Sequence, residues 1–121
     1  MRVLVVDDYM DTALTLVKLL EISGHDVRMA ADGFQALEVA RQWQPHCVLL
    51  DIGMPGMDGY QLAKRLRNEA GLSKARIVAF SGYTKDVSRF EDSGIDHYLI
   101  KPVSLANLRE VLDGKPPAPP Q

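Results

Sequence analysis

The stretch LLDIGMPGMDG, residues 49–59, carries the pattern that decides the fold. Its apolar start predicts the end of a buried β-strand, and its glycines and proline predict the loop that follows. Asp51 stands between the two. Because a carboxylate at the end of a buried strand is costly without a partner or a chemical role, the reason for Asp51 must lie elsewhere in the chain.

Five short apolar runs, including the one that ends at Asp51, predict β-strands. Four of them are almost continuously apolar, which is typical of strands covered on both faces. In the second run Arg28 alternates with Val27 and Met29, which predicts an edge strand. The five runs cover residues 3–6, 27–30, 47–50, 77–80 and 98–100.

Segments with a helical period lie between and after these runs. In residues 33–43, for example, Phe34, Leu37 and Ala40 fall on one helical face. The fourth segment is the weakest, with only Val87 and Phe90 clearly apolar. The five segments cover residues 10–23, 33–43, 59–69, 84–92 and 104–112. This alternation predicts an α/β fold, a doubly wound parallel sheet with right-handed crossovers and helices on both faces.

The length of 121 residues fits one domain, which we expect to cover residues 1–113. The remaining stretch GKPPAPPQ, residues 114–121, has nothing to bury and predicts a disordered, proline-rich tail or linker. Its PxxP spacing leaves open a second reading, a motif that docks into an aromatic groove.

The composition narrows the choice of partners and compartment. A net charge of −2, from 14 basic and 16 acidic residues, gives no field that attracts nucleic acid or an anionic membrane, so we expect no direct contact with either. The single cysteine, Cys47, lies in an apolar run and predicts a buried side chain without a disulfide. No apolar stretch approaches the ~20 residues of a membrane span. We expect a cytoplasmic protein.

Polar residues follow four of the five predicted strands. Asp7 and Asp8 follow the first, Asp51 the third, Ser81 the fourth and Lys101 the fifth. Each alone fits an ordinary turn or helix cap. The carboxyl ends of parallel strands, however, lie along one edge of the sheet, which is where ligands bind in open α/β folds. The sequence therefore predicts that these five side chains converge.

Three converging carboxylates repel one another and need a counter-charge, of which Lys101 supplies only one. A divalent cation with oxygen ligands supplies the rest, and the donor set suits Mg²⁺, with Mn²⁺ as a substitute. We expect Asp8 and Asp51 to hold the metal directly and Asp7 to join through water. Mg²⁺ beside a carboxylate, a hydroxyl and a lysine is typical of phosphoryl chemistry.

In that chemistry Asp51 is the candidate nucleophile, because a carboxylate can attack phosphorus to give an acyl phosphate. Lys101 would neutralise the phosphoryl oxygens, and Ser81 would donate a hydrogen bond to one of them. The adjacent acids, DIGMPGMDG, FSG and YLIKP occur at four strand ends in this order. In these features residues 2–112 resemble a receiver domain of a bacterial two-component response regulator.

The resemblance implies a flavodoxin-like (βα)5 fold with strand order 2-1-3-4-5. It implies that Asp51 is phosphorylated by a phosphohistidine of a histidine kinase or phosphotransfer domain, and that the Gly53 backbone carbonyl completes the protein's share of the Mg²⁺ shell. It also implies a cis peptide bond between Lys101 and Pro102. The wording SGYTK and GIDHYLIKPV resembles receivers fused to hybrid histidine kinases more than DNA-binding regulators.

The resemblance further assigns Ser81 and Tyr98 as the switch pair. When the hydroxyl moves toward the phosphoryl group, the ring can turn into the space it leaves and reshape the surface of the fourth helix, fifth strand and fifth helix. The other reading of Tyr98 is an ordinary half-buried strand aromatic. Gly53 leaves the hydrolytic water unblocked whereas Tyr83 is large enough to shield it, so the lifetime of the phosphoryl group is not predicted.

Two other classes of protein compete with this interpretation. A phosphorylation-independent adaptor, a pseudo-receiver, usually lacks one or more site residues, and none is missing here. An aspartyl-phosphate phosphatase of the haloacid dehalogenase type shares the groups of the site, but expects its nucleophile in an Asp-x-Asp on the first strand. As an isolated domain the chain is expected to be no enzyme beyond its own phosphorylation and dephosphorylation.

Overall fold

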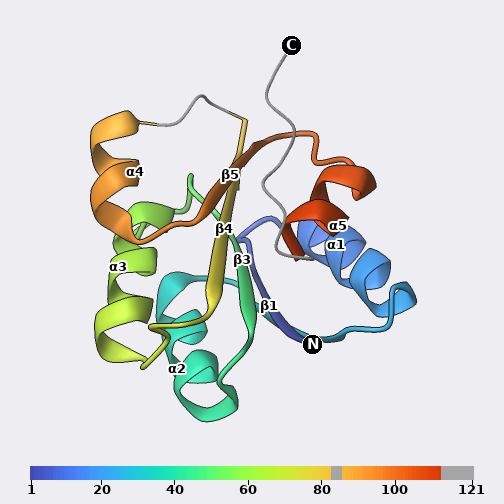
Figure 1. Ribbon diagram of the computed structural model, residues 1–121, viewed down its shortest axis with the longest axis horizontal. Helices are drawn as coiled ribbons and strands as arrows, with labels where there is room; N and C mark the ends of the chain where they lie inside the picture. The colour runs from blue at the N-terminus through green and yellow to red at the C-terminus, as the bar shows by residue number, and fades with distance from the viewer. Residues whose placement is uncertain (83–85, 113–121) are drawn as a thin grey trace.

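The computed structural model describes residues 1–82 and 86–112, which form one α/β unit (Figure 1). Tyr83 and the proline-rich tail lie outside the described residues. The elements in chain order are β1 Arg2–Val6, α1 Met10–Ile22, β2 Asp26–Ala30, α2 Gly33–Trp43, β3 Cys47–Asp51, α3 Gly59–Glu69, β4 Arg76–Ser81, α4 Val87–Ser93, β5 His97–Ile100 and α5 Leu105–Leu112.

All five strands form one parallel sheet in the order β2-β1-β3-β4-β5, as the sequence and the family resemblance predicted. The register pairs Val6 with Leu50, Asp51 with Phe80, and Ser81 with Ile100, so the carboxyl ends of β1, β3, β4 and β5 are level. This levelling brings the loops after those strands together at one edge.

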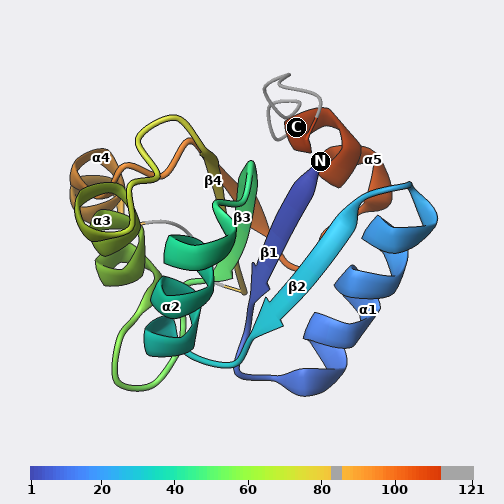
Figure 2. The same ribbon diagram turned by 90° about the horizontal axis from the view of Figure 1, so that it is seen from below.

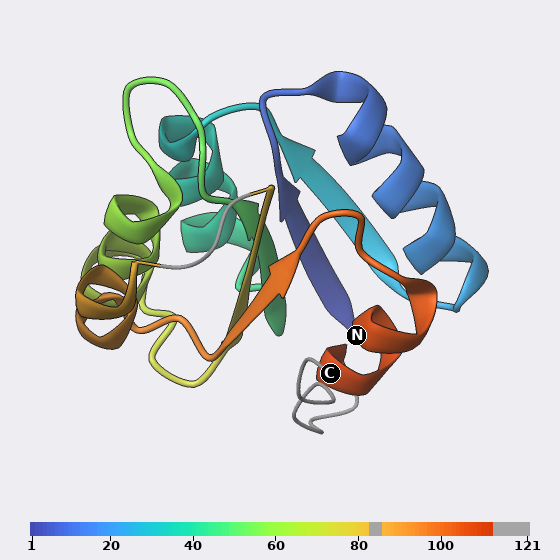
Figure 3. The same cartoon turned by 90° about the horizontal axis from the view of Figure 1, so that it is seen from above.

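Helices cover both faces of the sheet, with α1 and α5 on one face and α2, α3 and α4 on the other (Figures 2 and 3). Alternate strand residues face the two layers. In β1, Leu4 packs with the α2 and α3 side, whereas Val3 and Val5 pack with α1 and α5. Cys47 is buried in the second layer, and burial raises the pKa of its thiol to about 12.

Three expectations need correction. The last run was predicted to be covered on both faces, but β5 is the second edge strand and Ile100 is 50% exposed. Phe34 was placed on the buried face of its helix, but it is 64% exposed at the start of α2. The fourth helix was predicted over residues 84–92, whereas α4 begins after Asp86, whose side chain accepts a hydrogen bond from the Arg89 N–H.

The loop after β3 returns tightly into α3, and this fixes the helix against the candidate nucleophile. Asp58 caps α3 in a reciprocal capping box with Gln61. The Gly59 N–H donates to the Ile52 carbonyl at 2.9 Å. A Cβ built on Gly59 would lie 2.7 Å from the Asp51 carbonyl oxygen, so only glycine allows this close approach.

Candidate functional site

The sheet edge brings together the side chains that the sequence singled out. Asp7, Asp8 and Asp51 can each place a carboxylate oxygen within 4.8 Å of the others. Asp7 and Asp51 are buried, whereas Asp8 is exposed. The Asp7 Oδ1 accepts the Tyr9 N–H at 2.9 Å, and the Asp51 Oδ1 accepts the Gly53 N–H at 3.2 Å. These backbone bonds fix the orientation of both carboxylates.

Asp7 is a buried carboxylate close to a second negative charge. Its Oδ2 is buried and accepts no hydrogen bond from any residue between 1 and 82 or between 86 and 112. Burial raises the pKa of Asp7 to about 6, against the lowering effect of the Tyr9 N–H, and the nearby Asp51 carboxylate raises it further. A buried acceptor without a donor, beside a second carboxylate, is the environment that a bound cation relieves. The three acids therefore fit an oxygen-liganded divalent cation such as Mg²⁺.

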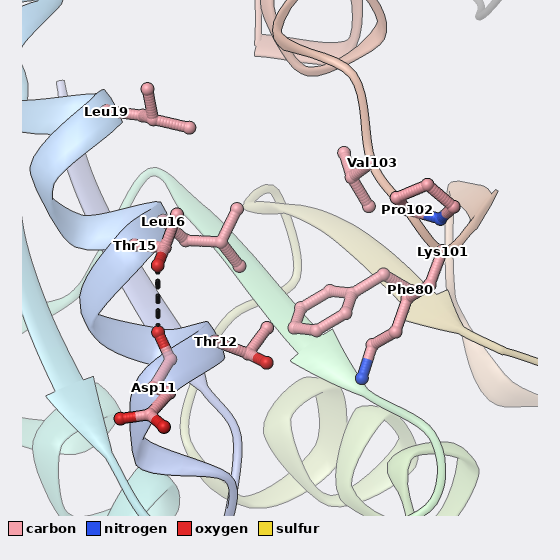
Figure 4. A pocket seen from close by; sticks show the side chains of 9 residues that line it. All are labelled: Asp11, Thr12, Thr15, Leu16, Leu19, Phe80, Lys101, Pro102 and Val103. Atoms are coloured by element: carbon pink, nitrogen blue, oxygen red, sulfur yellow. Dashed lines mark hydrogen bonds between the residues drawn. The ribbon is translucent and has the colours of Figure 1, made fainter.

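Lys101 supplies the positive charge of the site. Its Nζ lies 3.3 Å from the Asp51 Oδ2 and 5.1 Å from the centre of the Phe80 ring. The Lys101–Pro102 peptide bond is cis. Figure 4 shows Lys101 and Phe80 together at a cavity of about 510 Å³, which lies between α1 and the segment that precedes α5. Lys101 therefore contacts both the acidic cluster, through Asp51, and this cavity.

Ser81 and Tyr98 lie on the neighbouring strands β4 and β5. Ser81 is 2% exposed, and Tyr98 is half-buried with its ring in a T-shaped contact with Phe90 of α4, at 6.2 Å between centres. Burial raises the pKa of the Tyr98 phenol, while a hydrogen bond with Ser81 lowers it and contact with the Tyr60 hydroxyl raises it. The two hydroxyls predicted as a switch pair are therefore in contact with each other.

Gly53 leaves room beside the candidate nucleophile. A Cβ built on this residue would meet no described atom within 4 Å. Its N–H already contacts Asp51, so its backbone runs alongside the acidic cluster.

Sequence reasoning missed three contributors to the site. The Tyr9 N–H holds Asp7, Phe80 packs against Lys101, and Tyr60 contacts Tyr98. No sequence signal marks a backbone donor. Phe80 and Tyr60 lie in apolar or helical patterns that predict only core packing.

The model of the response regulator receiver domain matches residues 3–113, so the chain belongs to that family. It is a receiver domain of the two-component response regulators, and its five-stranded fold is the one found in chemotaxis-type receivers. Membership of this family argues against the other enzyme class considered from the sequence, an aspartyl-phosphate phosphatase of the haloacid dehalogenase type. Receiver domains are phosphoacceptors, with at most autophosphorylation and autodephosphorylation activity, and generally bind Mg²⁺ at an acidic pocket such as the aspartate cluster seen here.

Several known proteins are similar to the chain. The DNA-binding response regulator MtrA of Mycobacterium tuberculosis is 39% identical over 101 residues, which are 84% of this chain and 44% of MtrA. The chemotaxis protein CheY4 of Vibrio cholerae has a TM-score of 0.88 at 26% identity, covering 93% of this chain and 96% of CheY4. A Burkholderia pseudomallei response regulator, solved with a phosphorylated aspartic acid, a calcium ion and citrate, has a TM-score of 0.84 at 28% identity, covering 92% and 65%.

The chain spans about half the length of the curated relatives it matches. MtrA is a DNA-binding regulator rather than a hybrid kinase, so the expected likeness to hybrid-kinase receivers stays a prediction. Within residues 1–82 and 86–112, no helix has both the length and the apolar composition needed to cross a membrane.

Proposed function

We propose that Asp51 is the phosphoacceptor of this receiver domain. The observation that carries the proposal is the position of its carboxylate, at the end of the central strand β3, in contact with Lys101 and within 4.8 Å of two further acids. The aspartyl phosphate in the B. pseudomallei regulator supports this chemistry for the family.

The donor is a phosphohistidine of a histidine kinase or phosphotransfer domain. An Asp51 oxygen attacks the phosphorus, the O–P bond forms as the P–N bond to imidazole breaks, and the leaving nitrogen keeps the electron pair. Lys101 neutralises charge on the phosphoryl oxygens, and Ser81 donates a hydrogen bond to one of them. Hydrolysis of the acyl phosphate restores the Asp51 carboxylate.

The ligands of Mg²⁺, or of Mn²⁺ in its place, would be Asp8, Asp51 and the Gly53 carbonyl, with Asp7 joining through water. The bound ion would offset the negative charge that gathers between the acids and the phosphoryl group. Burial and the neighbouring Asp51 raise the pKa of Asp7, and a cation at this position would favour its ionised form.

The output is a change on the surface of α4, β5 and α5. When Ser81 turns toward the phosphoryl group, it leaves Tyr98, which is then able to take a new position against α4. Exposed apolar side chains on this surface, Val87, Ile100 and Leu105, offer a partner a binding area. The domain ends near residue 113, and the output partner, a fused effector or kinase domain or a separate protein, acts in the cytoplasm.

A small phosphodonor tests the proposal directly. Purified protein with Mg²⁺ and acetyl phosphate should gain the mass of one phosphoryl group, whereas Asp51→Asn should gain none. Asp26→Asn, which changes an exposed carboxylate at the start of β2 outside the cluster, is the matched control and should be modified like the wild type. An unmodified wild-type protein would favour the phosphorylation-independent adaptor instead.

A further inference from the structure

Helix α4 is held in place mainly by polar contacts. Ser93 is its only buried residue, Val87 is 57% exposed, and Phe90 is half-buried against Tyr98. A seven-residue helix with so little apolar burial has low local stability, so the contacts at its ends determine where it lies.

Those contacts come chiefly from α3, which lies beside α4 (Figure 3). The Tyr60 hydroxyl accepts the Asp86 N–H at 2.9 Å, at the start of α4. The Arg89 guanidinium lies 4.6 Å from the centre of the Tyr60 ring and pairs with the Asp58 carboxylate. We call these four residues, Asp58, Tyr60, Asp86 and Arg89, the α3–α4 latch.

The α3 side of the latch is fixed to the phosphorylation site. Asp58 caps α3, and the adjacent Gly59 lies against the Asp51 backbone. The Tyr60 ring is 5% exposed within the core that α3 shares with the sheet. Because this ring is almost fully buried, its hydroxyl keeps a defined position at the start of α4.

The same hydroxyl also meets the switch pair. The Tyr98 phenol contacts the hydroxyls of both Ser81 and Tyr60, and its ring packs against Phe90 of α4 with 6.2 Å between the ring centres. The Tyr60 oxygen thus connects Tyr98 with the N–H of Asp86, the N-cap residue of α4. When Ser81 moves away from Tyr98, the contact between the Tyr98 hydroxyl and the Tyr60 oxygen changes as well.

We propose that Tyr60 is a positioning residue that couples the Ser81–Tyr98 pair to α4, so that phosphorylation of Asp51 loosens the α3–α4 latch and releases the first turn of the helix. The coupling rests on the proposed phosphoacceptor role of Asp51. In this coupling α3 helps to transmit the change from the phosphorylation site to α4. Asp58, Tyr60 and Arg89, none of which binds the phosphoryl group, hold α4 in its position before phosphorylation.

Amide hydrogen exchange in α4 tests the coupling, measured with and without Mg²⁺ and beryllofluoride as a phosphoryl mimic. Tyr60→Phe keeps the buried ring and removes only the hydroxyl. One hydrogen bond contributes about 1 kcal/mol, so the exchange of α4 amides should rise about 5-fold without the mimic. With the mimic bound the latch is already loosened, and the rise should fall below about 2-fold.

Two control pairs separate the latch from general effects. Tyr9→Phe removes a hydroxyl from a residue that is 62% exposed, and should leave α4 exchange unchanged. Arg89→Gln breaks the ion pair with Asp58 and should act like Tyr60→Phe, whereas Arg65→Gln breaks a pair within α3, with Glu69, and should not. No rise in either latch variant, or an equal rise with and without the mimic, would overturn the coupling.

The two proposals fail in different ways. If wild-type protein neither binds beryllofluoride nor gains a phosphoryl group, the phosphoacceptor role is lost and the coupling falls with it. If the wild type is modified at Asp51 but the latch variants show the same response to the mimic as the wild type, the coupling alone is wrong.

Discussion

Replacing Asp7 with asparagine should stabilise the metal-free protein at neutral pH. The pKa of Asp7 is raised from 3.8 to about 6 by its burial beside Asp51. At about 1.36 kcal/mol for each pKa unit, this difference corresponds to at most about 3 kcal/mol that the folded protein loses when the carboxyl ionises. Asparagine keeps the oxygen that accepts the Tyr9 N–H and places an amide donor where the Asp7 Oδ2 has no partner among the described residues.

The sign of the pH dependence follows from proton binding. Between pH 3.8 and about 6 the folded state binds the Asp7 proton more tightly than the unfolded state does, so the stability of the wild type falls as pH rises through this window. Asp7→Asn has no ionisable carboxyl at this position, so its stability does not fall in this way as pH rises. In EDTA the free energy of unfolding of the variant should exceed that of the wild type by up to about 3 kcal/mol at pH 7.5, and the two should converge near pH 4.

Urea unfolding from pH 4 to 7.5, with EDTA or with Mg²⁺, measures both effects. Mg²⁺ stabilises whichever protein binds it in the folded state. The wild type should therefore gain more than Asp7→Asn, and the advantage of the variant should shrink or reverse. Asp26→Asn, at an exposed carboxylate that starts β2, should change stability by less than about 0.5 kcal/mol. A less stable Asp7→Asn in EDTA, or a difference that does not depend on pH, would refute the reasoning.

Two further variants test the division of roles at the sheet edge. Lys101→Ala should still bind Mg²⁺ but accept phosphoryl groups poorly, because it removes the cation beside Asp51 and none of the oxygen ligands; loss of Mg²⁺ binding, measured by titration, would contradict this division. Gly59→Ala should destabilise the protein by about 1–3 kcal/mol, because the new Cβ has only 2.7 Å to the Asp51 carbonyl oxygen. Gly53→Ala, with open space around its Cβ, is the control in the same denaturation assay, and equal effects of the two would count against the close approach.

Most of the fold and the convergence of the site could be predicted because both follow from short-range patterns. The apolar runs identify the strands, and a parallel sheet necessarily gathers the residues after them at one edge. Asp7, Asp51, Ser81 and Lys101 could therefore be grouped without any contact being known. The order of the strands needed the family resemblance, since alternating strands and helices alone do not decide which strands are neighbours.

The parts that could not be predicted depend on long-range contacts. Tyr60 has the spacing of a core residue, and its bond to the Asp86 N–H joins residues 26 positions apart. Phe34 has the same periodic position as its buried neighbours, yet it lies at the first turn of α2, 5.9 Å from the Arg65 guanidinium. Burial at a helix end depends on what packs there, and a periodic pattern does not contain that information.

The most direct test of the account is to identify the residue that carries the phosphoryl group. After treatment with acetyl phosphate and Mg²⁺, borohydride reduction converts an aspartyl phosphate to homoserine, which peptide mass spectrometry locates. We expect homoserine at position 51 and at no other aspartate. Homoserine at position 7 or 8, or a protein that reacts without conversion of Asp51, would contradict it.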